Sequence, residues 1–139
     1  GVAQLKDMLN QYGIKVMGFD LPYFDGPDAC LHLMSLISIL DNNLAIVYKP
    51  FFPVELLKFL ESKGFECIDI PKKDFLDSNG LAINILALSP RNVIMLEGFS
   101  KIEAILKKKG CNVQTFDGKE LCIKAEGGPT CLTRPIYRK

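Results

Sequence analysis

Cys131 is the residue of this sequence best placed for covalent chemistry, because of the residues on either side of it. It follows Gly127, Gly128 and Pro129 and precedes a short β-like run, residues 132–133. Glycine allows a positive φ and a close approach to a ligand, and proline stiffens the next step. An exposed thiol with rigid neighbours suits a nucleophile, whereas a thiol packed as a small core residue would be inert. This stretch alone leaves both interpretations open.

His32 is the single histidine of the chain and therefore the candidate for a general base. It lies in the apolar run 30–35, where a histidine is more often a core residue than a catalyst. A lone histidine far upstream of a glycine-framed cysteine is, however, a pattern of intracellular enzymes whose nucleophile and base meet only in the fold. Together, Cys131 and His32 indicate a cysteine nucleophile with an imidazole base.

The composition is that of one globular domain of 139 residues, long enough to bury a core. The formal net charge is +1, so no strong field argues for nucleic acid or a membrane surface as a partner. The basic run 107–109 ends a predicted helix, where cations complement the helix dipole. No apolar run reaches the length of a membrane span.

The cysteines indicate reduced thiols in a cytoplasmic protein. Their number is odd, no Cys-x-x-Cys pair occurs, and no secretory signal is visible. A structural zinc site needs ligands paired at short spacing, so we expect no metal, and we expect no cofactor. The five cysteines are Cys30, Cys67, Cys111, Cys122 and Cys131.

A unit of helix, glycine and strand recurs three times, over residues 5–20, 56–71 and 102–117. Each copy has an amphipathic helix, a glycine suited to a helix C-terminus and a β-rich run. The glycines are Gly13, Gly64 and Gly110.

Two predicted β-hairpins lie between these copies. Runs 32–40 and 44–49 are joined by a turn at 41–43, and runs 82–88 and 92–96 by a turn at 89–91. The repeating unit is therefore strand, strand, helix, strand, and the fold class is α/β. About two full copies are present, with a partial copy at each end. Such units bury both faces of their sheets by packing against one another.

These residues resemble the amidinotransferase and arginine deiminase superfamily, the α/β-propeller enzymes also called penteins. The resemblance rests on residues 30–35 (CLHLMS), 80–88 (GLAINILAL) and 127–135 (GGPTCLTRP). It is strongest to the C-terminal half of bacterial dimethylarginine dimethylaminohydrolase-like proteins. It implies ββαβ repeats forming a partial propeller of about two to three blades, with residues 1–139 as a single domain.

The resemblance also implies a chemistry. The Cys131 thiolate would attack the central carbon of an arginine-like guanidinium or amidine, and His32 would protonate the departing amine. Water activated by His32 would then hydrolyse the covalent thiouronium adduct. Gly128, Thr130 and Arg134 are the expected contacts to the substrate. The Arg134 guanidinium would bind a carboxylate of the substrate. An asparagine recurs in the family's strand that residues 80–88 match, and Asn84 stands at that place. We expect Asn84 to make a structural hydrogen bond.

Two features bear on the substrate. Members of the family grip the guanidinium with carboxylates, several of them from the half of the propeller before the histidine. Asp20, Asp25 and Asp28 lie upstream of His32 but also fit turns around Gly26 and Pro27. Arginine deiminases have an aspartate two residues after the histidine. This chain has Met34 there, which favours the dimethylargininase-like branch or a substrate of different shape.

Other classes of function fit parts of the sequence. A non-catalytic propeller fragment, acting as a binding or assembly module, would explain the repeats but not the presence of both Cys131 and His32. A cysteine peptidase or amidase would need a residue to orient His32, and the spacing assigns none. We therefore expect an enzyme acting on guanidine C–N bonds, whose open sheet edges are covered by an N-terminal half or a second copy. This segment alone could then be inactive.

Overall fold

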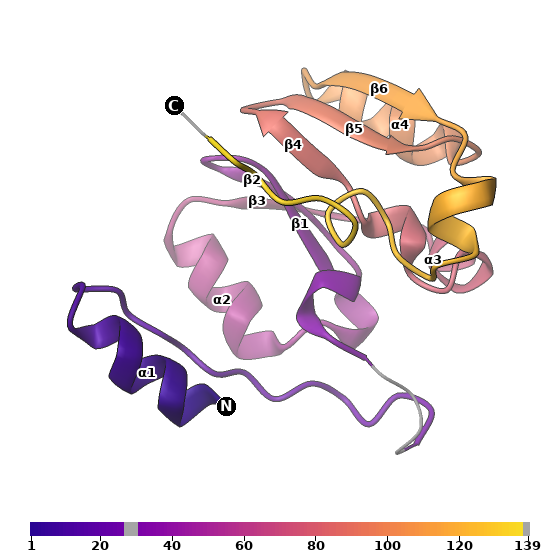
Figure 1. Cartoon of the computed structure of the whole chain (residues 1–139). Helices are drawn as coiled ribbons and strands as arrows, with labels where there is room; N and C mark the ends of the chain where they lie inside the picture. The colour runs from indigo at the N-terminus through magenta and orange to yellow at the C-terminus, as the bar shows by residue number, and fades with distance from the viewer. Residues whose placement is uncertain (27–30, 138–139) are drawn as a thin grey trace.

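A computed structural model of the chain describes residues 1–26 and 31–137. Asp28 and Cys30, both considered above, lie outside the described residues. The described part contains two three-stranded sheets, each with a helix between its second and third strands (Figure 1). The first sheet consists of β1 (Ile37–Asp41), β2 (Leu44–Val47) and β3 (Glu66–Asp69), and the second of β4 (Leu86–Ser89), β5 (Asn92–Leu96) and β6 (Asn112–Phe116).

Both sheets have the same topology, which confirms the predicted ββαβ unit. β1 pairs with β2 antiparallel and β2 with β3 parallel, and the same holds for β4, β5 and β6. The crossover helices are α2 (Val54–Ser62) and α4 (Ser100–Lys108). The α/β class is therefore confirmed. The number of propeller blades stays a prediction, because the two described units do not close into a ring.

Each crossover helix ends in the same way. Gly64 and Gly110 both have φ of 80°, which a side chain would oppose. The amide of Phe65 donates to the carbonyl of Leu60, and that of Cys111 to Leu106, each at 3.0 Å. This bond between the second residue past the cap and the last helical turn stops the helix and turns the chain into the next strand.

The third copy has the helix and the glycine turn but not the strand. α1 (Val2–Asn10) is followed by Gly13 at φ 69°, and the amide of Ile14 donates to the carbonyl of Leu9 at 3.2 Å. The predicted strand at 14–20 is wrong, because a strand requires a partner and this segment has none among the described residues. α1 buries no residue, and its Val2, Leu5 and Met8 are 48%, 49% and 63% exposed.

The predicted first strands of both hairpins begin too early. The structure places short 3-10 turns ahead of β1 and β4, since these segments lie outside the paired ladder.

A helix and a π-helical turn were also not predicted. The remaining elements are α3 (Lys72–Asp77), the 3-10 turns η1 (Leu33–Ser35), η2 (Lys49–Phe51) and η3 (Leu81–Ile83), and the π-helical turn η4 (Lys119–Ile123).

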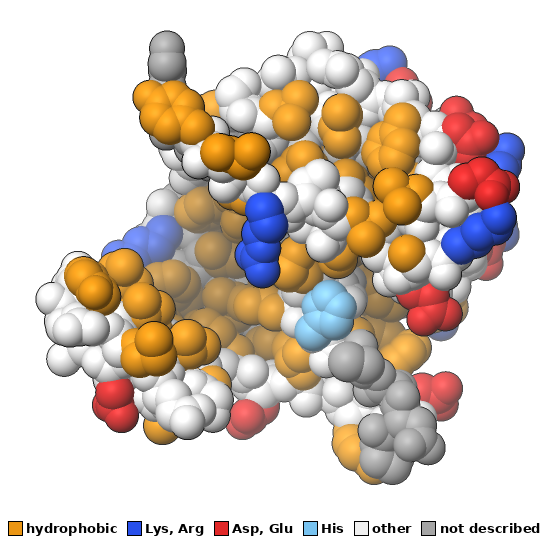
Figure 2. Space-filling model, in the orientation of Figure 1, with side chains coloured by type: hydrophobic (Ala, Val, Ile, Leu, Met, Phe, Trp, Pro, Cys, Tyr) orange, Lys and Arg blue, Asp and Glu red, His pale blue; other side chains and the backbone are white. Residues whose placement is uncertain are grey.

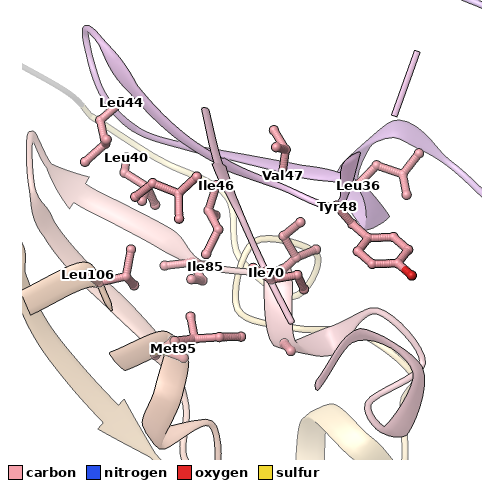
Figure 3. Close-up of a cluster of buried hydrophobic side chains, with 14 of the residues drawn as sticks. Leu36, Leu40, Leu44, Ile46, Val47, Tyr48, Ile70, Ile85, Met95 and Leu106 are labelled. Atoms are coloured by element: carbon pink, nitrogen blue, oxygen red, sulfur yellow. The ribbon is translucent and has the colours of Figure 1, made fainter. Parts of the chain in front are cut away.

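The hydrophobic core is shared by the two units, because β1 lies beside β4. Figure 3 shows side chains from both sheets pointing toward one another, with Leu106 of α4 beside them. α3 adds Phe75, whose ring stacks on Tyr48 at 3.7 Å between centroids. Among the described residues, no helix is long and apolar enough to cross a membrane. Ten core residues labelled in Figure 3 are Leu36, Leu40, Leu44, Ile46, Val47, Tyr48, Ile70, Ile85, Met95 and Leu106.

Arg91 joins the hairpin turns of the two units. Its Nε donates to Asp41 at 2.6 Å, its Nη2 to Asn43 at 3.3 Å, and its Nη1 to the carbonyl of Lys109. The backbone amide of Arg91 also donates to the carbonyl of Leu40 at 2.8 Å. The turns of two sheets are thus fixed to each other by one guanidinium, which offers several donors in a rigid plane.

We predict that protonation of Asp41 lowers the free energy of unfolding in acid. A hydrogen bond from the Asn42 amide and another from Arg91 lower the pKa of Asp41 below its usual 3.8. A lowered native pKa contributes stability above the unfolded pKa, and this is lost as pH falls through the native value. Urea unfolding should therefore show Asp41→Asn less stable than wild type at pH 7, with the gap narrowing below about pH 4. The control is Asp77→Asn, an exposed helix pair with Lys73, which should change little. A gap that does not depend on pH would contradict the assignment.

Candidate active site

Cys131 lies in a tight turn after a buried segment. Gly127, Gly128 and Pro129 are buried, whereas Cys131 is exposed. The amides of Cys131 and Leu132 both donate to the carbonyl of Gly128, at 3.0 and 3.1 Å. The predicted β-like run at 132–133 is not a strand, because the chain is still turning there. The thiol is therefore held by local backbone bonds and is open to solvent, which excludes its alternative role as a buried core residue.

The Asn84 side chain forms hydrogen bonds to two residues of the cysteine turn. Its Nδ2 donates to Cys131 Sγ at 2.9 Å, and its Oδ1 accepts from the Thr130 amide at 2.9 Å and from the Thr130 hydroxyl. Asn84 is 4% exposed and lies between η3 and β4. The amide orientation follows from this network, since the flipped form would set its NH₂ against the two Thr130 donors. The expectation of a hydrogen-bonding Asn84 is confirmed.

Gly128 is required by close packing and not by an unusual backbone. A Cβ at Gly128 would lie 2.4 Å from Cγ and 2.5 Å from Cβ of Asn84. The expected positive φ is not found at Gly127 or Gly128, and it occurs instead at Glu126, at 53°. The glycine lets the backbone of the turn approach the Asn84 side chain closely, because any side chain at position 128 would push the turn and Asn84 apart.

His32 is exposed, which contradicts its alternative role as a core residue. It precedes the η1 turn, and its Nε2 lies 3.4 Å from Ser35 Oγ. Figure 2 shows the histidine, the only one in the chain, beside a hollow with a largely hydrophobic floor. In the described part of the chain, no hydrogen bond joins His32 to Cys131. The pairing of the two as base and nucleophile stays a prediction.

The expected substrate contacts differ in how free their side chains are. The Thr130 hydroxyl is engaged with Asn84, while Arg134 is exposed beside a hollow of about 220 Å³ next to β4. Thr133, also beside the cysteine, donates to the carbonyl of Pro129 at 2.6 Å and so closes the turn. Substrate binding by Gly128, Thr130 and Arg134 stays a prediction.

The other described cysteines differ from Cys131 in their surroundings. Burial raises the pKa of Cys67, Cys111 and Cys122, so each is a weaker source of thiolate at neutral pH. Cys122 is 1% exposed, as expected for a core residue, and the nearby Cys131 raises its pKa further. Cys131 is the exposed thiol of the described set.

A cavity of about 690 Å³ lies at the ends of β5 and β6 and extends to Glu126, the residue before Gly127. Its lining mixes apolar residues such as Leu81, Leu96 and Phe99 with acidic ones, Asp77, Glu97, Asp117 and Glu126. Neither Cys131 nor His32 lines it. The described residues contain no group of three or more potential metal ligands.

No family model matches the chain. An arginine deiminase from Streptococcus agalactiae is 24% identical over 98 residues, which are 70% of this chain and 23% of that protein. An amidinotransferase of saxitoxin biosynthesis from Microseira wollei matches the whole chain and 39% of its own, with a TM-score of 0.78 and 20% identity. The chain has the fold of the amidinotransferase and arginine deiminase superfamily.

A third relative fits the same pattern. A cysteine-to-serine mutant of a dimethylarginine dimethylaminohydrolase from Pseudomonas aeruginosa, complexed with citrulline, has a TM-score of 0.65 and 22% identity. It is matched over 95% of this chain and 45% of its own. The resemblance seen in the sequence motifs is thus confirmed for the fold. The chain spans less than half the length of these relatives.

We predict that Gly128→Ala disturbs the cysteine turn. The added methyl would overlap Asn84, and overpacking of this kind costs about 1–3 kcal/mol in the free energy of unfolding. Gly127→Ala is the matched control, because its Cβ would meet Cys131 and Leu132 at 3.3 and 3.4 Å, a contact that small shifts relieve. Urea unfolding of both variants tests this, and equal losses in the two would contradict it.

Proposed function

We propose that this chain supplies the nucleophile and the general acid/base of an enzyme that acts on guanidine C–N bonds. One observation carries the proposal: Cys131 is exposed, yet its sulfur accepts a hydrogen bond from the buried amide of Asn84. An inert surface cysteine has no need of such a partner. The fold supports the same conclusion, since the relatives named above are an amidinotransferase, a dimethylarginine dimethylaminohydrolase and an arginine deiminase.

The reaction proceeds in two steps. Cys131 thiolate attacks the guanidinium carbon, the bond from that carbon to the leaving amine breaks, and His32 imidazolium gives the amine its proton. A thiouronium adduct on Cys131 remains. Neutral His32 then takes a proton from water, the hydroxide attacks the same carbon, and the C–S bond breaks to release the thiolate and a protonated ureido product, which gives up its remaining proton to solvent. An amine in place of water would give amidino transfer instead of hydrolysis.

The substrate that fits best is an arginine-like guanidine of the dimethylargininase type. Met34, two residues after His32, is 44% exposed and offers an apolar contact where a carboxylate would pair with an unsubstituted guanidinium. Arg134, exposed beyond the cysteine, suits the substrate carboxylate. Asp20 and Asp25 are exposed as well, but we assign them no role in gripping the cation. The reduced thiols suit a cytoplasmic setting.

The site also needs more polypeptide than these residues. We propose that residues 1–139 are one domain, the C-terminal part of a propeller, and that further chain or a second copy covers its open edges and completes the grip on the cation. The unpaired segment at 14–20 and the exposed face of α1 support this. The same features favour the second candidate, a non-catalytic assembly module, in which Cys131 would do no chemistry.

The first test is turnover. The chain should form ureido product from arginine or an N-methylated arginine, and Cys131→Ala should lower the rate at least about a thousandfold, as expected for loss of a nucleophile. Cys67→Ala, which removes a half-buried thiol in β3, is the control and should retain the rate. If the chain is silent, the longest reading frame that contains it should be assayed in the same way. Turnover by that protein with Cys131→Ala would overturn the proposal.

A second test reads the thiol directly. Iodoacetamide at pH 6 should label Cys131 faster than Cys67, Cys111 or Cys122, because these are half-buried or buried and have raised pKa values. His32→Ala should remove most of that advantage if imidazolium stabilises the thiolate. Leu33→Ala, an exposed neighbour in the same turn, should leave it intact. Slow and uniform labelling of all five thiols, Cys30 included, would favour the assembly module.

A further inference from the structure

Two polar side chains, Ser38 and Asn84, are buried in the described part of the chain, and they are connected. Ser38 of β1 and Asn84 are 7% and 4% exposed. The Ser38 hydroxyl donates to the carbonyl of Ile83 at 2.6 Å and accepts from the amide of Ile85 at 3.1 Å. The hydroxyl of one unit therefore clamps the backbone on both sides of Asn84 in the other unit.

The position of this clamp is informative. Asn84 and Ile85 lie after η3 and before β4, so strand pairing does not hold them. An apolar residue at position 38 would leave the carbonyl of Ile83 and the amide of Ile85 without these partners in a dry core, which is costly. The Ser38 hydroxyl provides a hydrogen-bond partner for both groups. It thereby fixes the backbone on either side of Asn84, and so the position of the Asn84 Cα.

The side-chain amide of Asn84 is equally constrained. Its Oδ1 accepts hydrogen bonds from the Thr130 amide and the Thr130 hydroxyl, so the amide plane cannot rotate without losing both. Its Nδ2 is thereby directed at Cys131 Sγ. A donor at this place favours the thiolate over the thiol, because hydrogen bonds to a charged acceptor are the stronger ones.

We propose that Ser38, Asn84 and Cys131 form a relay in which Asn84 orients and stabilises the reacting sulfur, and Ser38 is a positioning residue that acts through Asn84. This inference rests on the proposed role of Cys131 as nucleophile. The relay also spans the two ββαβ units, since Ser38 belongs to the strand that directly follows the His32 turn. It therefore ties the segment that carries His32 to the turn that carries Cys131.

The test measures the pH profile of iodoacetamide labelling at Cys131, with Cys67 of the same molecules as the internal reference. Asn84→Asp keeps an acceptor for Thr130 but replaces the donor to sulfur with a carboxylate oxygen. Its Cys131 profile should move to higher pH by about one unit, which is roughly a tenfold slower reaction at a fixed acid pH. Ser38→Ala should slow Cys131 by a smaller factor, about threefold, and leave Cys67 unchanged.

Two further variants separate this role from a purely structural one. Ser38→Thr keeps the hydroxyl and should restore the Cys131 rate. Ser78→Ala removes a serine that likewise donates to a carbonyl, of Phe75, and accepts from an amide, of Ala82, but that does not flank Asn84. It should lower stability without moving the Cys131 profile. Circular dichroism and urea midpoints identify the folded fraction, and rates are compared in folded protein.

The outcomes are distinct. An unchanged Cys131 profile in folded Asn84→Asp overturns the relay, and so does a Ser38→Ala variant that loses stability but not reactivity. If Ser38→Ala does not fold, Asn84→Asp and Ser38→Thr decide alone. Labelling needs no substrate, so relay effects without guanidine turnover, either by this chain or by the longest reading frame that contains it, would contradict the proposed function and not this inference.

Discussion

The structure depends on the packing of β1 against β4, the first strands of its two units. A three-stranded sheet with one helix has an uncovered face, and here each unit covers that face with the other. Because this contact joins the two sheets, side chains of both sheets fill one core. The segments just before those strands are brought together by the same contact. They carry His32 and Asn84, so the site follows from the packing of the repeat.

The elements with local signals could be predicted from the sequence. α2 and α4 begin and end within two residues of the expected runs, because the apolar spacing and the glycines Gly64 and Gly110 specify them directly. The strands at 14–20 and 132–133 were wrong for the opposite reason. A β-rich run becomes a strand only when another strand pairs with it, and pairing is a property of the fold. α3 is six residues long and lacks the periodicity that identified the other helices.

The candidate site was foreseen in part. Cys131 and His32 stand out by residue type, since one is framed by glycines and the other is unique in the chain. The bond from Asn84 to the sulfur could not be read from the sequence, because the two residues are 47 positions apart. The signal for it was present but ambiguous. Gly128 indicated a close approach, and the close neighbour is a side chain of the protein where a ligand was expected.

The buried polar groups show how a repeat fold can hold an exposed thiol in place without losing its core. The strands of both units are filled with apolar residues, and among the described residues the buried polar exceptions are Ser38 and Asn84. Each has its hydrogen-bonding groups satisfied, so neither leaves a buried donor or acceptor unpaired. A polar path thus runs from the middle of β1, through hydrogen bonds to the backbone on either side of Asn84 and then through the Asn84 side chain, to an exposed thiol. The apolar core of the repeat holds Ser38 and Asn84 in place, and their hydrogen bonds lead to one sulfur atom, that of Cys131.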